Sequence, residues 1–520
     1  MPKWLENAVF YEIYPQSFLD TNGDGIGDFE GIISKLDYIR GLGCNALWLN
    51  PCFDSPFKDA GYDVRDYRKT APRYGTNDDL KRLFVEAHKR GIRVLLDLVP
   101  GHTAEDHPWF VESAKAHPVK YRNRYIWTDH CFTRAEGLGF IGGEHERAAV
   151  YITNFFKCQP ALNFGFLNPQ EPWQLGMDHP DSIATREEIK DIMRFWLDAG
   201  CDGFRVDMAA SLVKYDDEEK SGTSAIWQNI RAMLDAQYPE AAIVAEWSDP
   251  TQAIRAGFHM DFLLAFKKNS GYQSLLRDYA LDEYNQPQGD NHSFFKRDAG
   301  GDIRRFLVDY LYHYDNTKDA GYISLVTGNH DVARISHTLS PKELALAYAV
   351  IFTLPGVPFL YYGDEIGMRY QAELPTKEGG YYRTGARTPM QWSAGANLGF
   401  STAAPEQLYL PVDASADAPT VEAQEQDADS LLSTVKALLK LRASEPDLQS
   451  KPNLTVLHGE ADLPFVYRRG GLVLAVNPGS TKASVGLDVE DGQPVFAIGG
   501  GTLHGGTCAV QPQSFVVWRG

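Results

Sequence analysis

The chain has 520 residues, 43% hydrophobic and 23% charged, which is long enough for one large globular domain with one or two smaller ones. Its net charge of −19 argues against nucleic acid as a partner, because proteins that bind nucleic acid carry a basic patch. The N-terminus has no apolar leader, no apolar run reaches membrane-spanning length, and six scattered cysteines form no CxxC pair. We therefore expect a cytoplasmic protein with buried free thiols and no membrane partner.

The first predicted strand, 9–15, leads into the stretch DTNGDGIGD. Asp20, Asn22 and Asp24 match the first three ligand positions of an EF-hand loop. The twelfth position is glycine rather than glutamate, and a strand rather than a helix precedes the loop, so a calcium sensor is not expected. The favoured hypothesis is a hard-cation site of oxygen ligands. The alternative is a loop whose Asp and Asn residues only form turns.

Short apolar runs and helical patterns then alternate along the chain. The runs are nearly continuous, as strands buried on both faces require, and eight of them predict a (β/α)8 TIM barrel. The predicted strands cover residues 9–15, 45–50, 92–99, 202–207, 241–247, 260–266, 322–331 and 358–365. The predicted helices cover residues 29–43, 78–91, 186–200, 223–237, 301–313, 341–354 and 427–443.

Two stretches do not follow this alternation. Residues 103–180 are irregular and rich in Pro, Gly and aromatic residues, and we interpret them as a domain inserted after the third strand. The barrel then comprises residues 1–102 and 181–445. Short strands with Gly and Pro turns at 446–520 predict a C-terminal antiparallel β domain, a β-sandwich. Residues 400–426, rich in Ala, Pro and Gln, predict a surface loop.

Carboxylates follow five of the eight predicted strands, at the end where barrel enzymes carry their chemistry. One such acid is commonly structural, but clustered carboxylates raise one another's pKa and indicate a function. We therefore predict an active site at this end of the barrel. Its candidate acids are Asp97, Asp207, Glu246, Asp331 and the pair Asp364-Glu365, and His102 and His330 stand close to two of them in sequence.

Arg205 and Asp207 are two residues apart on one strand, so both point the same way, and the guanidinium is expected to keep Asp207 ionised. Apolar neighbours are expected to keep Glu246 protonated. An ionised and a protonated carboxyl group are the nucleophile and acid of glycoside hydrolysis, and strands about 4.8 Å apart suit the retaining mechanism. The alternatives are an exposed strand-end Glu246 and a structural Asp207–Arg205 ion pair.

The motifs DLVPGH, GFRVD, VAEW and TGNHD, in this order, resemble the conserved regions of glycoside hydrolase family 13, the α-amylase family. YEIYPQSF, GYDVRDY and RTPMQW resemble its α-glucosidase and oligo-1,6-glucosidase branch. The resemblance covers about residues 5–400. It implies a nucleophile, a general acid/base and a third carboxylate at Asp207, Glu246 and Asp331. It also implies that the first sugar ring, in subsite −1, is held by Arg205, His102, His330 and Arg387.

The resemblance carries two further site assignments. Asp59 and Tyr62 match residues with which exo-acting relatives bind the terminal glucose, with Tyr62 as a stacking platform. The alternative is a turn aspartate beside a packed tyrosine. The first loop resembles a metal loop of this branch, which implies one structural Ca²⁺ site in place of a sensor. Its ligands would be Asp20, Asn22, Asp24, Asp28 and the carbonyl of Ile26.

Three positions depart from the family pattern. Gly101 replaces an asparagine that binds a different calcium in amylases, so a second calcium site is not predicted. Ala161 stands where a QPDLN motif has aspartate, which leaves the bonds of that loop open. Met208 follows Asp207 where the branch often has Val, Ala or Thr, so the preferred linkage is open.

The resemblance implies a retaining α-glucosidase that hydrolyses short α-glucosides or malto- and isomalto-oligosaccharides from the non-reducing end through a glucosyl-Asp intermediate. Transfer to a sugar hydroxyl would make it an α-glucosyltransferase. Two further hypotheses are an endo-acting amylase or cyclodextrin-type hydrolase, which Asp59 argues against, and a non-catalytic sugar-binding homologue, which the three carboxylates argue against. Phosphorylated substrates, the oligomeric state and the choice between Ca²⁺ and Mg²⁺ are left open.

Overall fold

The computed structural model of the protein describes residues 1–264, 270–283 and 286–520. Eight parallel strands form one sheet in the order β13-β10-β9-β8-β5-β2-β1-β14. Its strands are β1 (Phe10–Ile13), β2 (Ala46–Leu49), β5 (Arg93–Leu98), β8 (Gly203–Val206), β9 (Ala242–Ala245), β10 (Met260–Phe262), β13 (Tyr322–Ser324) and β14 (Phe359–Tyr361).

The two edges of this sheet meet just beyond β13. Val326 pairs with Phe359 in parallel, and the Phe359 N–H donates to the Leu325 carbonyl at 2.9 Å. Backbone hydrogen bonds thus close the sheet, as a barrel requires, and the predicted (β/α)8 barrel is confirmed. Residues 265 and 266 of the sixth predicted strand lie outside the described residues.

Helices follow most of the barrel strands. They are α1 (Phe29–Ser34), α2 (Leu36–Leu42), α3 (Asn77–Lys89), α5 (Pro180–Ala199), α6 (Ser221–Gln237), α7 (Pro250–Arg255), α8 (Ser270–Leu276), α9 (Ile303–Thr317), α10 (Pro341–Thr353) and α12 (Leu431–Ser444). The helix predicted at 29–43 is divided, because Lys35 has a ψ of 4° that breaks it. The helix predicted to begin at 186 begins at Pro180 instead, where His179 accepts the Asp181 N–H as its N-cap.

The inserted stretch contains α4 (Pro108–Ser113), β6 (Phe140–Gly142) and β7 (Val150–Ile152), while the hairpin of β3 (Phe53–Asp54) and β4 (Asp66–Thr70) precedes it. It has a small apolar cluster of its own, which includes Ile126, Ile152 and Ala161. Ala161 is fully buried there, and its backbone pairs with His102 at the end of the barrel strand. An alanine thus fits where the family motif has aspartate. The boundaries 103 and 180 stay a prediction.

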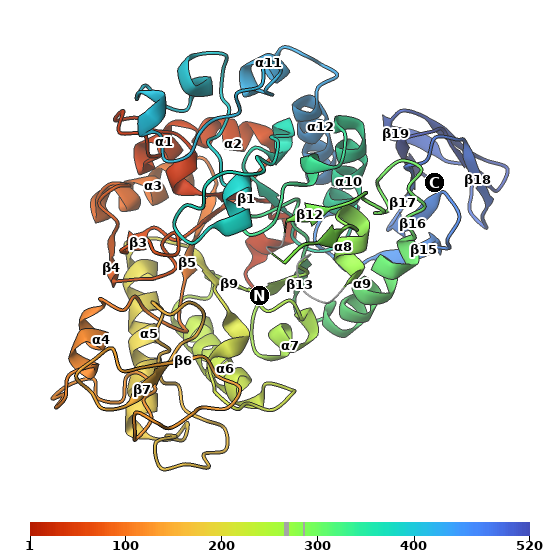
Figure 1. Cartoon of the computed structure of the whole chain (residues 1–520). Helices are drawn as coiled ribbons and strands as arrows, with labels where there is room; N and C mark the ends of the chain where they lie inside the picture. Colours follow the sequence, from red (N-terminus) through yellow and green to blue (C-terminus); the bar gives the residue numbers. More distant parts are fainter. Residues whose placement is uncertain (265–269, 284–285) are drawn as a thin grey trace.

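The C-terminal strands form two antiparallel sheets, which confirms the predicted antiparallel domain (blue in Figure 1). One sheet has the order β15-β16-β17-β22-β19 and the other β18-β21-β20. Val473, Val516 and Trp518 of the larger sheet and Leu503 and Cys508 of the smaller one form one buried cluster. The strands are β15 (Leu454–His458), β16 (Phe465–Arg469), β17 (Leu472–Asn477), β18 (Ala483–Gly486), β19 (Gln493–Ile498), β20 (Gly501–His504), β21 (Thr507–Val510) and β22 (Ser514–Arg519).

Smaller elements complete the description. The predicted surface loop at 400–426 contains α11 (Val421–Glu425), and β11 (Ala280–Leu281) pairs with β12 (Pro287–Gln288). All six cysteines are free thiols; Cys131 is exposed and Cys158 half-buried, so the expectation of buried thiols is correct for the other four only. Within the described ranges, no helix combines the length and apolarity that a membrane crossing would need.

Candidate active site

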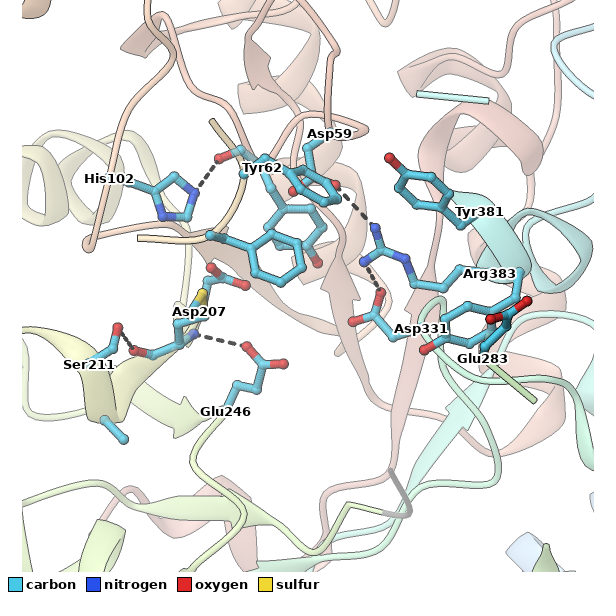
Figure 2. Close-up of a pocket in the computed structure, with 15 residues that line it drawn as sticks. Asp59, Tyr62, His102, Asp207, Ser211, Glu246, Glu283, Asp331, Tyr381 and Arg383 are labelled. Atoms are coloured by element: carbon cyan, nitrogen blue, oxygen red, sulfur yellow. Dashed lines mark hydrogen bonds and ion pairs between the residues drawn. The ribbon is translucent and has the colours of Figure 1, made fainter. Parts of the chain in front are cut away.

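A cavity of about 660 Å³ lies where the barrel strands end (Figure 2). Its size falls within the range of pockets for small molecules. Six of the predicted site residues line it: Asp59, Tyr62, His102, Asp207, Glu246 and Asp331. Arg205, His330 and Arg387 are not among the lining residues; each is buried and bonded to one that is. The structure thus brings the predicted residues together in one cavity and in the layer beneath it.

One guanidinium joins the carboxylates at the ends of three neighbouring strands. Arg205 Nη1 donates to Asp97 Oδ1 and Asp207 Oδ1, both at 2.9 Å, and Nη2 lies 3.1 Å from Glu246 Oε2. Arg205 pairs with Val244 in the register of β8 and β9, so Asp207 and Glu246 stand at the same level. Figure 2 shows both acids facing the same cavity. They are therefore placed to act on one bond.

The sharing of Arg205 changes the expected ionisation of Asp207. Burial raises the pKa of Asp207 well above its ordinary value, the Glu246 carboxylate raises it further, and Arg205 only opposes these effects. Burial also raises the pKa of Asp97 to about 6. The expectation that Arg205 keeps Asp207 ionised did not allow for this sharing, in which one cation faces three acids.

His330 belongs to a hydrogen-bonded network beneath the cavity. Its Nδ1 lies 2.9 Å from Glu12 Oε1 and 3.1 Å from Asn50 Nδ2, and its Nε2 lies 2.7 Å from Tyr62 Oη. Tyr62 Oη also donates to Asp97 at 3.0 Å. Burial lowers the pKa of His330 well below its ordinary value, so the ring is neutral. Glu12 and Asn50 were not predicted, because only the closed barrel brings β1 and β2 next to His330.

Arg383 bridges two acids across the cavity and was not predicted either. Nη1 donates to Asp331 Oδ1 at 3.0 Å and Nη2 to Asp59 Oδ1 at 3.3 Å (Figure 2). Arg387 Nη2 also donates to Asp331 Oδ1 at 3.0 Å, and Gln159 Nε2 donates to Asp59 Oδ2 at 2.8 Å. Arg383 stands four residues before the RTPMQW motif, in the 3₁₀ helix η6 (Tyr381–Ala386), with nothing in the sequence to mark it.

With this geometry in view, the family follows from comparison with known proteins. Residues 12–451 match the family described as "Alpha amylase, catalytic domain". The chain belongs to the α-amylase family. It is therefore an enzyme of glycoside hydrolase family 13, and its curated relatives place it in the α-glucosidase-like branch.

Three relatives illustrate the range of this branch. The chain is 33% identical over 483 residues to "Trehalose synthase/amylase TreS" of Mycobacterium tuberculosis, covering 86% of this chain and 76% of the relative. It is 32% identical over 502 residues to "Oligo-1,6-glucosidase" of Heyndrickxia coagulans, covering 85% and 86%. Among solved structures, an α-glucosyl transfer enzyme, XgtA, superposes with a TM-score of 0.81 at 27% identity over the full length of both chains.

In this α-amylase family enzyme, His102 lies between the Tyr62 carbonyl and Asn154 of the inserted segment. Its Nε2 lies 3.1 Å from the Tyr62 carbonyl and its Nδ1 3.2 Å from Asn154 Nδ2. Lys214 Nζ donates to Asn154 Oδ1 at 2.9 Å. A Cβ on Gly101 would approach Asn154 Nδ2 to 2.6 Å, so the departure at Gly101 leaves room for this amide. Burial lowers the pKa of His102 to about 3, which keeps the ring neutral.

The cavity mouth is aromatic and carries one further acid. Phe155 and Tyr381 are 51% and 60% exposed, and Phe156 lies between them with ring centroids 4.4 Å and 6.1 Å away. Aromatic faces of this kind can stack on sugar rings. Met208 lines the same cavity with a left-handed φ of 42°, and its N–H donates to Glu246 Oε2 at 2.9 Å. Glu283 also lines the cavity (Figure 2).

The acids after β14 are structural, contrary to the prediction that strand-end acids serve the site. Asp364 accepts hydrogen bonds from Arg334 at 2.8 Å and Thr327 at 2.7 Å. Glu365 Oε1 accepts from Tyr11 Oη at 2.7 Å and Tyr38 Oη at 2.8 Å. Neither acid is among the residues that line the cavity.

Glu365 is expected to make stability depend on pH. Burial raises the pKa of Glu365 from 4.5 to about 7, so the folded state keeps a proton that the unfolded state releases. The contribution of this proton to the free energy of unfolding is therefore complete below about pH 4.5 and is lost as the pH rises through 7. Glu365→Gln keeps an acceptor for both tyrosines but has no proton to lose. The free energy of unfolding of this variant should therefore fall by about 3 kcal/mol less than that of the wild type as the pH rises. Thermal midpoints between pH 4.5 and 8 measure the slope, with the exposed Glu406→Gln as control. An unchanged slope in Glu365→Gln would contradict the assignment.

The loop predicted to bind calcium is held by bonds among its own residues. Asp20 accepts the N–H groups of Gly23 and Gly25, both at 2.8 Å, and the two glycines have positive φ. Asp28 accepts the Gly31 N–H at 2.7 Å and caps α1. No group of three or more His, Cys, Asp or Glu side chains suited to a metal occurs in the part of the chain that is described. The calcium site stays a prediction.

Proposed function

We propose that this enzyme is a retaining α-glucosidase that cleaves short, uncharged α-glucosides from the non-reducing end. The observation that supports it best is the placement of Asp207 and Glu246 on neighbouring nitrogens of Arg205, facing one cavity. Two carboxyl groups this close suit a covalent mechanism better than one that needs room for water between them. Asp59, bridged by Arg383 to Asp331, would close the end of the cavity that receives the terminal sugar.

In the first step, an oxygen of Asp207 attacks the anomeric carbon while Glu246 donates its proton to the leaving oxygen, and the glycosidic bond breaks. Glu246 Oε2 accepts the Met208 N–H and faces Arg205, so the proton belongs on Oε1. Arg205 Nη1 donates to Asp207 Oδ1 at 2.9 Å and so favours the carboxylate form of Asp207 that this attack requires. In the second step, Glu246 removes a proton from water, whose oxygen attacks the anomeric carbon and releases Asp207.

Asp331 would accept hydrogen bonds from the hydroxyl groups of the sugar in subsite −1. Burial raises the pKa of Asp331, but Arg383 and Arg387, which both donate to Oδ1 at 3.0 Å, lower it below its ordinary value. The carboxylate therefore stays ionised, and charged acceptors form stronger hydrogen bonds than neutral ones. Tyr62 would stack on this sugar.

The charges of the cavity favour an uncharged substrate. Five acids line it: Asp59, Asp207, Glu246, Glu283 and Asp331. Among the lining residues that the structure describes, Arg383 is the cation, and it is bound to Asp59 and Asp331. A phosphorylated glucoside would meet uncompensated negative charge, which disfavours it.

Glucosyl transfer is the second candidate. Phe155 and Tyr381 expose aromatic surface at the mouth, where an acceptor sugar could stack in place of water. Two of the relatives are named as a trehalose synthase and a glucosyl transfer enzyme. Incubation with maltose, isomaltose, trehalose, sucrose, maltotriose and starch, followed by proton NMR from the first minutes, separates the candidates. Early α-glucose supports the glucosidase, isomeric or longer products support transfer, and early β-glucose rejects retention.

Asp59→Ala tests the exo-acting mode. Asp59 holds Arg383 and Gln159 at the end of the cavity. Its loss should lower kcat/KM for short glucosides by roughly 10- to 100-fold, which corresponds to the free energy of a charged hydrogen bond. Activity on starch should fall less, because internal chain segments do not use a closed end. Asp106→Ala, an exposed aspartate paired with Arg65, is the control. Unchanged activity on short substrates would reject the exo-acting mode.

We also propose one structural cation in the first loop, held by oxygens of Asp20, Asn22, Asp24, Asp28 and Ile26. The oxygen-only donor set suits Ca²⁺. Millimolar Ca²⁺ after EDTA treatment should raise the thermal midpoint by roughly 2–5 °C, because a ligand stabilises the state that binds it. Asp24→Ala should abolish the response, whereas Asp66→Ala, which breaks a similar aspartate-to-backbone bond, should keep it. A midpoint insensitive to Ca²⁺ and Mg²⁺ would reject the site.

A further inference from the structure

A buried carboxylate supports the turn that follows Glu246. Asp261 lies in β10 beside the last residue of β9 and is fully buried. Its Oδ1 accepts the backbone N–H groups of Trp247 at 3.0 Å and Ser248 at 3.4 Å, and its Oδ2 accepts that of Asp249 at 2.9 Å. Three successive N–H groups therefore converge on one side chain.

This turn has a conformation that needs such support. Ser248 has a φ of +61°, in the left-handed region that non-glycine residues adopt at a cost. The N–H groups of residues 247 and 248 belong to buried residues, and a buried donor without an acceptor is unfavourable. A charged acceptor that binds several N–H groups at once offsets both effects. The shape of the turn therefore depends on Asp261.

The turn at residues 247–249 also restrains the backbone of Glu246. The Trp247 N–H belongs to the same peptide unit as the Glu246 carbonyl, and that carbonyl accepts the Ala209 N–H at 3.2 Å. On the other side, the Glu246 N–H donates to the Val206 carbonyl at 2.9 Å. Both peptide units that flank the Glu246 Cα are thus held, which sets the direction in which its side chain leaves the backbone.

We propose that Asp261 is a positioning residue for Glu246: by holding residues 247–249 it keeps the Glu246 carboxyl where it can protonate the leaving oxygen. This inference rests on the proposed role of Glu246 as general acid. The sequence alone does not reveal Asp261, because it stands inside an apolar run and its partners lie in the turn after β9.

Asp261→Asn tests the inference. The amide keeps one acceptor oxygen and replaces the other with a donor, so it cannot accept all three N–H groups. A misplaced acid should slow cleavage of a disaccharide, whose sugar leaving group needs a proton, and should affect α-glucosyl fluoride much less. We expect kcat/KM for the disaccharide, which reports the bond-breaking first step, to fall roughly 100-fold, in the range that general acid catalysis contributes, with less than about tenfold loss of kcat/KM on the fluoride. Equal losses on both substrates, or no loss on either, would overturn the proposal.

Two controls accompany this variant. Asp302→Asn alters a helix-capping carboxylate outside this turn, which accepts the Arg304 N–H at 2.9 Å as the cap of α9, and should keep both activities. Glu246→Gln should show the same selectivity between the two substrates as Asp261→Asn. If Asp261→Asn does not fold, the double variant with Ser248→Gly replaces it, because glycine adopts a positive φ without support. Wild-type enzyme inactive on both substrates would reject the proposed function itself, which separates that failure from failure of the inference.

Discussion

Replacing Asp207 by asparagine is expected to lower kcat on any α-glucoside by on the order of 10⁴- to 10⁶-fold, the scale seen when a nucleophile is removed. The amide keeps the shape of the side chain and can face Arg205 with its oxygen, but it cannot form the bond to the anomeric carbon. Initial rates on the preferred disaccharide and on α-glucosyl fluoride measure the loss. Both substrates should be affected equally, because attack by Asp207 is needed whichever group leaves.

The same variant should not be less stable than the wild type. Burial and the nearby Glu246 disfavour the ionised form of Asp207, so a neutral amide relieves repulsion within the group of acids around Arg205. The thermal midpoint should stay equal or rise. Asp364→Asn, a buried strand-end aspartate bonded to Arg334 outside the cavity, is the matched control and should keep kcat. Activity of Asp207→Asn within a hundredfold of wild type would reject Asp207 as the nucleophile.

Much of the barrel could be predicted because its strands are buried on both faces and read as continuous apolar runs. All four residues of β9 are buried, and the run 241–247 identified it without any tertiary information. The division of the helix predicted at 29–43 could not be predicted, because no Gly or Pro stands at Lys35, where the helix breaks. The early start of α5 has a visible cause in Pro180, which suits the first turn of a helix.

Site residues could be predicted where their position at the end of a strand fixes their location in the barrel. Asp207, Glu246 and Asp331 follow strands of one parallel barrel, so their side chains meet at one end. The ionisation of Asp207 was not predictable, because the sequence shows neither how deeply Asp207 is buried nor that Asp97 shares Arg205 through the register of β5 and β8. Asp261 and Asn154 could not be predicted for a related reason, since each bonds to residues outside its own segment. A sequence motif identifies residues that carry the chemistry. The hydrogen-bond partners that these residues share can be identified only when the strand order is known.

Arg383→Ala is expected to lower kcat/KM for short α-glucosides by roughly 10²- to 10³-fold. The change leaves Asp59 and Asp331 facing the cavity without the cation that bridges them, and removing one member of a buried ion pair costs about 3–5 kcal/mol. Arg387 still pairs with Asp331 at 3.0 Å, so the ionised form of Asp331 survives and the larger change falls on Asp59.

The loss should therefore appear mainly as a higher KM. The pocket for the terminal sugar changes shape, whereas Asp207 and Glu246 keep their positions. Arg369→Ala, which breaks ion pairs with Asp413 and Asp417 at a more exposed position, should leave both constants within about twofold, as most surface ion pairs contribute little. Added guanidinium ions should restore part of the activity of Arg383→Ala and none of that of Asp207→Asn. A loss confined to kcat would instead place Arg383 among the groups that stabilise the transition state, since an interaction made only there raises kcat and leaves KM unchanged.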